Sequence, residues 1–421
     1  QKDCESNSGK KHLDNSVTYL LFNSTLTESN YDSSMSLNRL PEGNLSSLIE
    51  KSAINSVLIL QWRDLEDSEA GGSEIHSHNI AQIWASEGLE ITFRTSAVKN
   101  SSKLVSRNGY TSVRSGGRFG VFLSSPTDII RRRLGEFDAL VEVWNGVPFM
   151  TPLLTNGPNM TFLHHQHGPL WNVALPEPFA TLGRFYERSI APTFYRSTPI
   201  VTLSNSSAFE LSSVLGLNKE NIFVVEPGIS SSFHSATKKS EYPLVVVAGR
   251  LSPYKRIDSV INAIEKIREK IPNVRLEIIG EGPEESNIRS VLASLKDPSW
   301  IDLKGHVSES DLIDAYQRAW VVTSASISEG WGMTLTEAAR CGTASVASNI
   351  PGHSDAVSDG VSGFLYDNEE EYQNKLLSLL SSRSNATEIG ESAYNWSSRF
   401  TWEKAATESF RVLASTKPHN V

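Results

Sequence analysis

Two glutamates, Glu329 and Glu337, mark the stretch of the chain best suited to chemistry. Gly330 and Gly332 lie between them and allow a loop whose backbone approaches a ligand closely. A helix is predicted over 334–340, so Glu329 would precede its N-terminus and Glu337 would lie one turn inside it. Carboxylates accept from neighbouring hydroxyls, and a helix N-terminus favours an anion. The pattern predicts a site for a phosphorylated, polyhydroxylated ligand; for either glutamate alone, the alternative is an acidic partner of the helix dipole.

Two basic residues that could bind phosphate follow a predicted strand over 244–248. Arg250 lies just after this strand and Lys255 at the start of the next helix. A guanidinium binds phosphate through two parallel N–H groups, and a lysine adds a mobile charge. With a helix N-terminus they could hold a diphosphate without a metal, and the chain has no Asp-x-Asp pair to place a divalent cation. One buried ion pair plus one solvated lysine is the alternative.

Two strand–helix alternations must position these groups, which predicts an α/β protein with two doubly wound domains in tandem and a cleft between them. Ligands of such sheets bind beyond the carboxyl ends of the strands, where these motifs lie. Gly71 and Gly72 occupy the first strand-to-helix turn and would let backbone N–H groups approach a phosphate. The strands are expected over 56–62, 89–95, 139–144, 160–163, 199–204 and 221–225, then over 244–248, 275–279, 301–303, 321–323, 344–347 and 363–366.

The domain boundaries follow from composition. Residues 1–52 are rich in Ser, Asn, Asp and Lys and are expected to form a polar, mostly disordered or loosely attached extension. The first domain is predicted over 53–228, with a helical insertion over 169–195 near the site. A polar linker over 229–243 leads to the second domain over 244–395, and a C-terminal helical segment covers 396–421.

The bulk composition is that of a globular chain of 421 residues with a net charge of -9. This charge argues against nucleic acid as a partner. Only Cys4 and Cys341 are present, so neither a disulfide framework nor a cysteine metal site is predicted. Without a membrane-length apolar run or a signal-peptide core, we expect a cytoplasmic protein.

One segment carries the opposite charge. Residues 97–133 contain eight basic side chains and one acid, Asp128, and their glycines suggest that much of the segment is loop. We expect this segment to bring the first domain to an anionic acceptor, or to an anionic membrane at the inner face of the cytoplasmic membrane. A solvated basic face with no partner is the alternative. The basic residues are Lys99, Lys103, Arg107, Arg114, Arg118, Arg131, Arg132 and Arg133.

Taken in order, the motifs resemble those of the retaining glycosyltransferases of family 4, which have the GT-B fold of two Rossmann-like domains. The resemblance covers about residues 55–412 and is more specific in the second half. It rests on Gly249-Arg250-Leu251, Lys255, Gly280-Glu281-Gly282, the glutamates at 329 and 337, and Pro351-Gly352.

The resemblance implies roles for these positions toward a nucleotide-diphosphate sugar. Arg250 and Lys255 would bind the diphosphate, Glu337 the ribose hydroxyls, and Gly282 would lie near the base. Glu329 would contact the sugar. The remaining donor-binding positions implied are Trp331, Gly332, Met333 and Leu335, with Gly71 and Gly72 near the distal phosphate.

A histidine of the first domain would face the sugar at the reaction centre. His164 and His165 both fit this position, so the sequence leaves the choice open. Their spacing would also suit zinc, but no third type of ligand lies nearby in sequence, and no metal is expected. His76 and His78 are expected to be structural.

The expected activity is transfer of a hexose from a UDP- or GDP-linked donor to a hydroxyl acceptor, lipid-linked or phosphorylated, in cell-envelope glycolipid or polysaccharide synthesis. Retention implies that the departing phosphate takes the acceptor proton, so the protein's contribution is electrostatic and no cofactor is expected. Two alternatives remain: a non-catalytic or regulatory sugar-nucleotide-binding protein, and a sugar-nucleotide 2-epimerase on the same fold.

Overall fold

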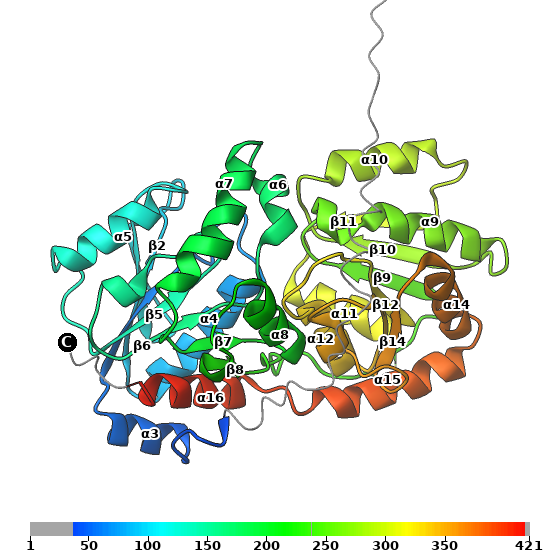
Figure 1. The fold of residues 1–421 in the computed structure, drawn as a ribbon. Coiled ribbons are helices and arrows are strands. Elements are labelled where there is room, and N and C mark those ends of the chain that lie inside the picture. The colour runs from blue at the N-terminus through cyan, green and yellow to red at the C-terminus, as the bar shows by residue number, and fades with distance from the viewer. Residues whose placement is uncertain (1–36, 237, 417–421) are drawn as a thin grey trace, which may run out of the picture.

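A computed structural model describes residues 37–236 and 238–416, which form two α/β domains joined side by side (Figure 1). Each domain has one sheet dominated by parallel strands with helices packed on it. The predicted class, two doubly wound domains in tandem, is confirmed.

The first domain is built on an eight-stranded sheet in which strand order reverses beside β1. All neighbouring strands are parallel except β3 and β4, which form an antiparallel hairpin at one edge. Strand β5 is buried along its whole length, as expected when helices cover both faces. In spatial order the strands are β3 (Leu104–Arg107), β4 (Tyr110–Arg114), β2 (Glu90–Thr95), β1 (Ser56–Leu60), β5 (Ala139–Val143), β6 (Asn159–Phe162), β7 (Ile200–Thr202) and β8 (Ile222–Val224).

The helices of the first domain connect these strands and add one insertion. The expected helical insertion after β6 is present as a series of short turns and helices, including a π-helical turn, η3. The helices are α3 (Leu45–Ser52), α4 (Gly72–Ser86), α5 (Val121–Ile130), η1 (Thr151–Leu153), η2 (Gly168–Leu170), α6 (Trp171–Ala174), α7 (Phe179–Phe185), η3 (Tyr186–Ile190), η4 (Ala191–Thr193), α8 (Asn205–Val214) and η5 (Lys219–Asn221).

The second domain has a six-stranded, all-parallel sheet whose order also reverses beside its first strand. Its strands, in spatial order, are β11 (Ile301–Gly305), β10 (Arg275–Ile279), β9 (Leu244–Ala248), β12 (Val321–Ser324), β13 (Ala344–Ser348) and β14 (Gly363–Tyr366). The helices are η6 (Pro253–Lys255), α9 (Ile257–Arg268), α10 (Glu285–Ser294), α11 (Glu309–Arg318), α12 (Met333–Arg340), α13 (His353–Ala356), α14 (Glu369–Leu380) and α15 (Arg383–Ser397).

The last helix, α16 (Trp402–Ala414), follows α15 of the second domain and packs under the first domain (Figure 1). The indole N–H of Trp84 on α4 donates to the carbonyl of Ala406 at 2.9 Å, and the Trp84 ring meets Phe410 edge-on. Gly228 lies so close to the start of α16 that a Cβ there would come within 2.3 Å of the Trp402 nitrogen. The chain therefore crosses between the domains twice, at 228 and before α16.

Residues 37–52 differ from the loose extension expected from their polar composition. Helix α3 is capped by the Asn44 side chain, and its Leu45 and Leu48 are buried in the core of the first domain. Arg411 of α16 donates to the carbonyls of Leu37 and Pro41 and ties the preceding turn down. Few apolar residues suffice here because they lie on one helix face. Residues 1–36, the rest of the predicted extension, lie outside the described residues.

The basic segment 97–133 also differs from the loop expected from its glycines, because it contains the β3–β4 hairpin and α5. Three of its arginines are committed to acids of the 64–69 loop. Arg114 is buried and lies 2.6 Å from Asp64, Arg107 lies 3.0 Å from the same carboxylate, and Arg118 lies 2.6 Å from Glu69. Three of the eight positive charges counted along the segment are therefore paired with acids of the same domain.

Candidate active site

The centre of the candidate site is an ion pair between Lys255, at the end of η6, and Glu329, in the loop before α12. The Lys255 ammonium lies 2.5 Å from the Glu329 carboxylate, and both side chains are largely buried. Burial disfavours charge on each, but the partner's opposite charge outweighs it, so the pKa of Lys255 is raised and the pKa of Glu329 is lowered. Ser326 also donates to Glu329 at 2.8 Å. The structure thus brings two predicted residues together as a fixed, charged pair.

The loop after β9, which leads to Lys255, is in direct backbone contact with the loop after β10 at the carboxyl ends of the strands. Gly280 follows β10 with a positive φ of 131°, and a Cβ there would come within 2.0 Å of the Gly249 carbonyl oxygen. At Gly282 a Cβ would meet the Leu251 carbonyl oxygen at 2.2 Å. Both glycines are therefore required for the loops to meet, which gives Gly282 a packing role in addition to the predicted one near a base.

Two helix N-termini, one from each domain, converge beside the Lys255–Glu329 pair. Gly72 is the first residue of α4, and a Cβ there would lie 3.4 Å from the sulfur of Met333, the first residue of α12. Gly332 precedes α12 with a φ of 111°, so the loop turns sharply into the helix. Since each N-terminus presents free N–H groups and a partial positive charge, this junction favours a polyanion such as a diphosphate.

His165 and His164 point in different directions, which distinguishes the two candidates that the sequence could not. The His165 Nδ1 lies near Gly330, 3.2 Å from a Cβ built there, and has no hydrogen-bond partner although it is buried. Burial lowers the pKa of His165, and the charge of Glu329 opposes that shift. His164 instead points away, with its Nε2 3.1 Å from the Nδ1 of His76 on α4. Of the two, only the His165 ring faces the glutamate loop.

His164 and His76 form a buried pair, and burial lowers the pKa of His76 to about 3. His78 also packs inside the domain, stacked on Phe93 and 2.8 Å from the Tyr110 hydroxyl. Both rings of α4 therefore fill structural positions. The prediction that His164 could face a sugar is not supported by its orientation, because its ring serves the packing of α4 on the sheet.

The loop after His165 is held by a buried carboxylate that the sequence reasoning missed. Glu187, in the π-helical turn η3, accepts from the backbone N–H of His167 at 2.7 Å and of Gly168 at 3.2 Å. It also accepts from the indole N–H of Trp171 at 2.8 Å. Burial raises the pKa of Glu187, and these three donors oppose that rise. Since Glu187 is 20 residues away in sequence, no local pattern connects it to this loop.

Arg250 reaches across the domain boundary rather than toward Lys255. Its guanidinium lies 3.7 Å from the Glu69 carboxylate, and it donates to the Glu69 carbonyl at 3.5 Å. Glu69 also binds Arg63 at 2.9 Å and Arg118 at 2.6 Å. Three arginines therefore surround the Glu69 carboxylate at the domain boundary. Because the ion pair of Arg250 is long, an incoming phosphate could replace Glu69 as its partner.

Glu337 lies on α12 beside α11, where burial and the charge of Glu309 raise its pKa to about 7. The nearby Tyr316 hydroxyl opposes this shift. Leu335 is buried in the core under the site, and Trp331 meets Phe400 edge-on there. The backbone of Trp331 remains in the glutamate loop, whereas its ring and the Leu335 side chain support that loop from below.

A further histidine, His353, lies against the same loop and was not predicted. A Cβ at Gly332 would come within 2.9 Å of the His353 ring, whose Nδ1 lies 3.0 Å from the Ser348 carbonyl. Burial lowers its pKa to about 4, and the Nε2 is buried without a partner. The proximity to Pro351-Gly352 is the only sequence signal that could have indicated it.

The two domains are latched next to the glutamate loop by a carboxylate that crosses between them. Asp355 of α13 accepts from the Asn205 backbone N–H at 2.9 Å and from the Ser206 hydroxyl at 2.5 Å, at the N-terminus of α8. In return, the Ser206 hydroxyl accepts from the Gly352 N–H at 2.8 Å. A Cβ at Gly352 would lie 2.7 Å from the Glu329 carbonyl oxygen, so the latch and the loop are in contact.

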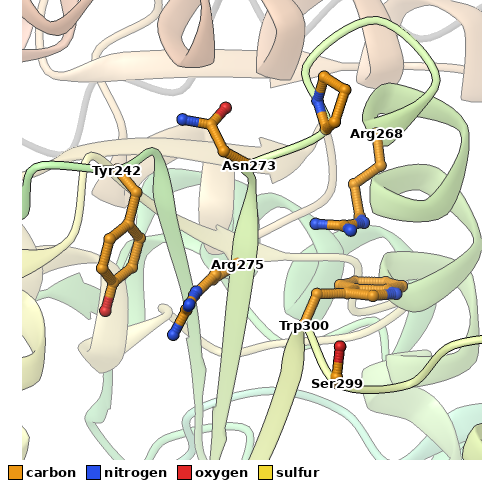
Figure 2. A pocket seen from close by; sticks show the side chains of 7 residues that line it. Tyr242, Arg268, Asn273, Arg275, Ser299 and Trp300 are labelled. Atoms are coloured by element: carbon orange, nitrogen blue, oxygen red, sulfur yellow. The ribbon is translucent and has the colours of Figure 1, made fainter.

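A shallow hollow of about 200 Å³ lies elsewhere, lined by Tyr242, Arg268, Pro272, Asn273, Arg275, Ser299 and Trp300 (Figure 2). These residues precede or begin β9, β10 and β11, so the hollow lies at the amino ends of parallel strands, opposite the candidate site. Arg268 lies over the ring of Trp300 and Arg275 over that of Tyr242. Each guanidinium is thus engaged in stacking, and the hollow has none of the predicted site residues.

Within the described ranges, no group of three or more His, Cys, Asp or Glu is arranged to hold a metal.

The fold and the second domain are similar to known glycosyltransferases. The sucrose-phosphate synthase of Thermosynechococcus elongatus superimposes with a TM-score of 0.70 at 16% identity, covering 84% of this chain and 96% of that chain. An Anabaena protein solved with UDP-glucose superimposes with a TM-score of 0.66 at 16% identity, over 84% of this chain and 98% of that one. These similarities show that the fold is GT-B.

In sequence, the D-inositol 3-phosphate glycosyltransferase of Streptomyces bingchenggensis is 27% identical over 237 residues, 51% of this chain and 52% of that protein. The chain spans about half, or less, of the length of the curated relatives it matches. Residues 229–396, which carry Arg250, Lys255, Glu329 and Glu337, match the family of glycosyl transferases group 1.

Proposed function

We propose that the chain is a retaining glycosyltransferase that moves a hexose from a nucleotide-diphosphate sugar to a hydroxyl acceptor. The observation that carries this proposal is the Lys255–Glu329 pair at the junction of two helix N-termini, inside the segment similar to group 1 glycosyltransferases. Positive charge and free N–H groups suit the diphosphate, and the glutamate suits sugar hydroxyls. The neighbour solved with UDP-glucose favours a UDP-linked donor over a GDP-linked one.

In this proposal the diphosphate lies between Lys255, Arg250 and the starts of α4 and α12. The bond from the sugar C1 to the diphosphate oxygen breaks on the face where the acceptor oxygen bonds to C1, which retains the configuration. The acceptor's proton passes to the departing phosphate oxygen, so no side chain acts as a base. The fixed cationic groups stabilise the charge that develops on the diphosphate, without a metal or resident cofactor.

His165 and Glu329 are assigned to the sugar in this account. Because its pKa is lowered, His165 is neutral at physiological pH and can exchange a hydrogen bond with a sugar hydroxyl without adding charge. The acceptor enters from the first domain beside the loop that Glu187 holds, and we propose a lipid-linked or phosphorylated acceptor of envelope synthesis. The polar groups left without partners at His165 and His353 are the ones such a ligand would satisfy.

The test is release of the nucleoside diphosphate from a panel of UDP-, GDP- and ADP-linked hexoses by the full chain, with and without candidate acceptors. Donor-dependent release should be largest with a UDP-hexose, and Arg250→Ala should lower it by about a hundredfold or more, because its contact strengthens as the phosphate leaves. The control Lys270→Ala, which changes an exposed lysine of the second domain, should release the nucleotide at the parent rate. If Arg250→Ala releases the nucleotide at the parent rate, Arg250 does not bind the diphosphate.

A further inference from the structure

Exposed apolar side chains are concentrated in the first domain. Thirteen large hydrophobic residues are exposed in the described part of the chain, and all but Ile327 and Val361 lie between positions 75 and 194. The densest group occurs within 16 residues, on α7 and the two turns after it: Phe179, Leu182, Phe185, Ile190 and Phe194. A cluster of this kind on the surface commonly marks an interaction site.

Helix α7 carries apolar side chains on its exposed face, the reverse of the usual arrangement in an amphipathic helix. Ala180 is buried, and a Cβ at Gly183 would come within 2.6 Å of the Trp171 ring, so these residues form the inner face; Glu187, in the turn η3 that follows, is also buried. The opposite face would normally be polar. Instead Leu182 and Phe185 are 62% and 56% exposed there, and Phe179 is 60% exposed at the helix start.

The same segment is positively charged. Between 179 and 196 there are three arginines and one acid, Glu187, which is buried and points inward. Arg184 pairs with Glu177 at 2.8 Å. Arg188 and Arg196 are exposed and form no ion pair with any residue in the described ranges. The outer surface therefore combines aromatic and aliphatic groups with uncompensated guanidinium groups.

From these observations we infer that this surface docks onto an anionic lipid bilayer. We call it the α7 face: Phe179, Leu182, Phe185, Arg188, Ile190, Phe194 and Arg196. Aromatic rings and leucines enter the interface between headgroups and acyl chains, and arginines bind lipid phosphates. A second copy of the chain is a poorer occupant, because a two-fold interface pairs the same surface of both copies and would bring their unpaired guanidinium groups together. No helix in the described residues is long and apolar enough to cross a membrane.

The position of the α7 face relates it to the candidate site. Helix α7 projects beyond the rest of the first domain (Figure 1), and it continues directly into the turn whose Glu187 binds the loop from His167 to Trp171. A bilayer docked here would lie next to the acceptor side of the cleft. The docking does not depend on the proposed function, whereas delivery of a lipid-linked acceptor from that bilayer rests on it.

Vesicle co-sedimentation of the full chain tests the docking. Two vesicle types are used, phosphatidylcholine alone and phosphatidylcholine mixed with phosphatidylglycerol. We expect binding to the mixed vesicles only. The triple variant F179S/L182S/F185S should lose binding by about a hundredfold or more. The double variant R188Q/R196Q should lose about twenty-five-fold, about fivefold per arginine.

Matched controls remove similar groups elsewhere. Leu104→Ser with Val361→Ser removes exposed apolar groups, and Lys270→Gln with Lys296→Gln removes exposed charges; both should bind as the parent does. The inference is overturned by absent binding to mixed vesicles, by equal binding to both vesicle types, or by equal losses in the controls. The inference is also overturned, in favour of self-association, if the molecular mass of the protein in solution doubles as its concentration rises and the triple variant stays monomeric. UDP-hexose binding by each variant, measured without vesicles, reports separately on the proposed function.

Discussion

Asp355 of the second domain binds the N-terminus of α8 in the first domain, so the closed arrangement of the two domains depends on one carboxylate. In Asp355→Ala the N-terminus of α8 loses an acceptor that binds the Asn205 N–H and the Ser206 hydroxyl. An N-cap is worth about 1 kcal/mol, and a charge at a helix N-terminus adds up to about 1 kcal/mol. The closed arrangement should therefore lose about 2 kcal/mol relative to an open one, which is about thirtyfold in their ratio.

If catalysis needs the closed cleft, kcat/KM of Asp355→Ala should fall by up to about thirtyfold. Small-angle X-ray scattering at saturating donor should show a larger radius of gyration than the parent. Asp355→Asn keeps one acceptor oxygen and should lie between the two. The matched control is Asp258→Ala, because Asp258 lies in the first turn of α9 and pairs with Arg256 of the same domain. If Asp355→Ala has the kcat/KM and the scattering of the parent, the Asp355 contacts do not hold the two domains closed.

The remaining predictions concern the acceptor loop, the pH dependence and the metal. Glu187→Gln should lower kcat by about tenfold or more with little effect on the affinity for the donor, since only the loop after His165 is disturbed; Glu136→Gln is the control, and an equal loss of donor affinity would contradict it. The pKa of Glu337 is about 7 in the fold and 4.5 in the reference state, so the native carboxyl keeps its proton where the unfolded chain has lost it. The free energy of unfolding should fall as pH rises from 4.5 to 7, and Glu337→Gln should flatten that slope in chemical denaturation; a slope unchanged in the variant would show that other groups cause it. Activity should survive exhaustive chelation, because Lys255, Arg250 and helix ends replace a cation, and a strict requirement for Mg²⁺ or Mn²⁺ would contradict this.

Sequence patterns predicted most sheet elements of both domains because strands such as β5, β6 and β12 are buried along their whole length and read as short apolar runs. The β3–β4 hairpin was missed although Asn108-Gly109 sits between its strands with positive φ at both residues, a strong hairpin signal. The count of glycines and basic residues in this segment obscured that signal.

The glutamate loop and Lys255 could each be predicted because a pattern of neighbouring residues marks each of them, although the two lie 74 residues apart. Contacts between distant segments could not. Asp355 binds Asn205 across 150 residues, and nothing near either residue indicates the other. The same holds for Arg250, whose partner Glu69 belongs to the first domain. The choice between His164 and His165 depended on which way each ring turns at the end of β6, and adjacent residues in extended chain point to opposite sides.

Calorimetric titration of the full chain with a UDP-hexose, in the presence of a chelator, tests most directly that the Lys255–Glu329 pair holds a nucleotide-diphosphate sugar. The account predicts one site per chain, loss of affinity by about tenfold or more in Lys255→Ala, and parent affinity in the control Lys270→Ala. UDP alone should show the lysine effect, whereas Glu329→Gln should weaken the UDP-hexose more than UDP. The account is contradicted if Lys255→Ala binds the UDP-hexose as tightly as the parent, or if the parent binds none of the UDP-, GDP- or ADP-hexoses.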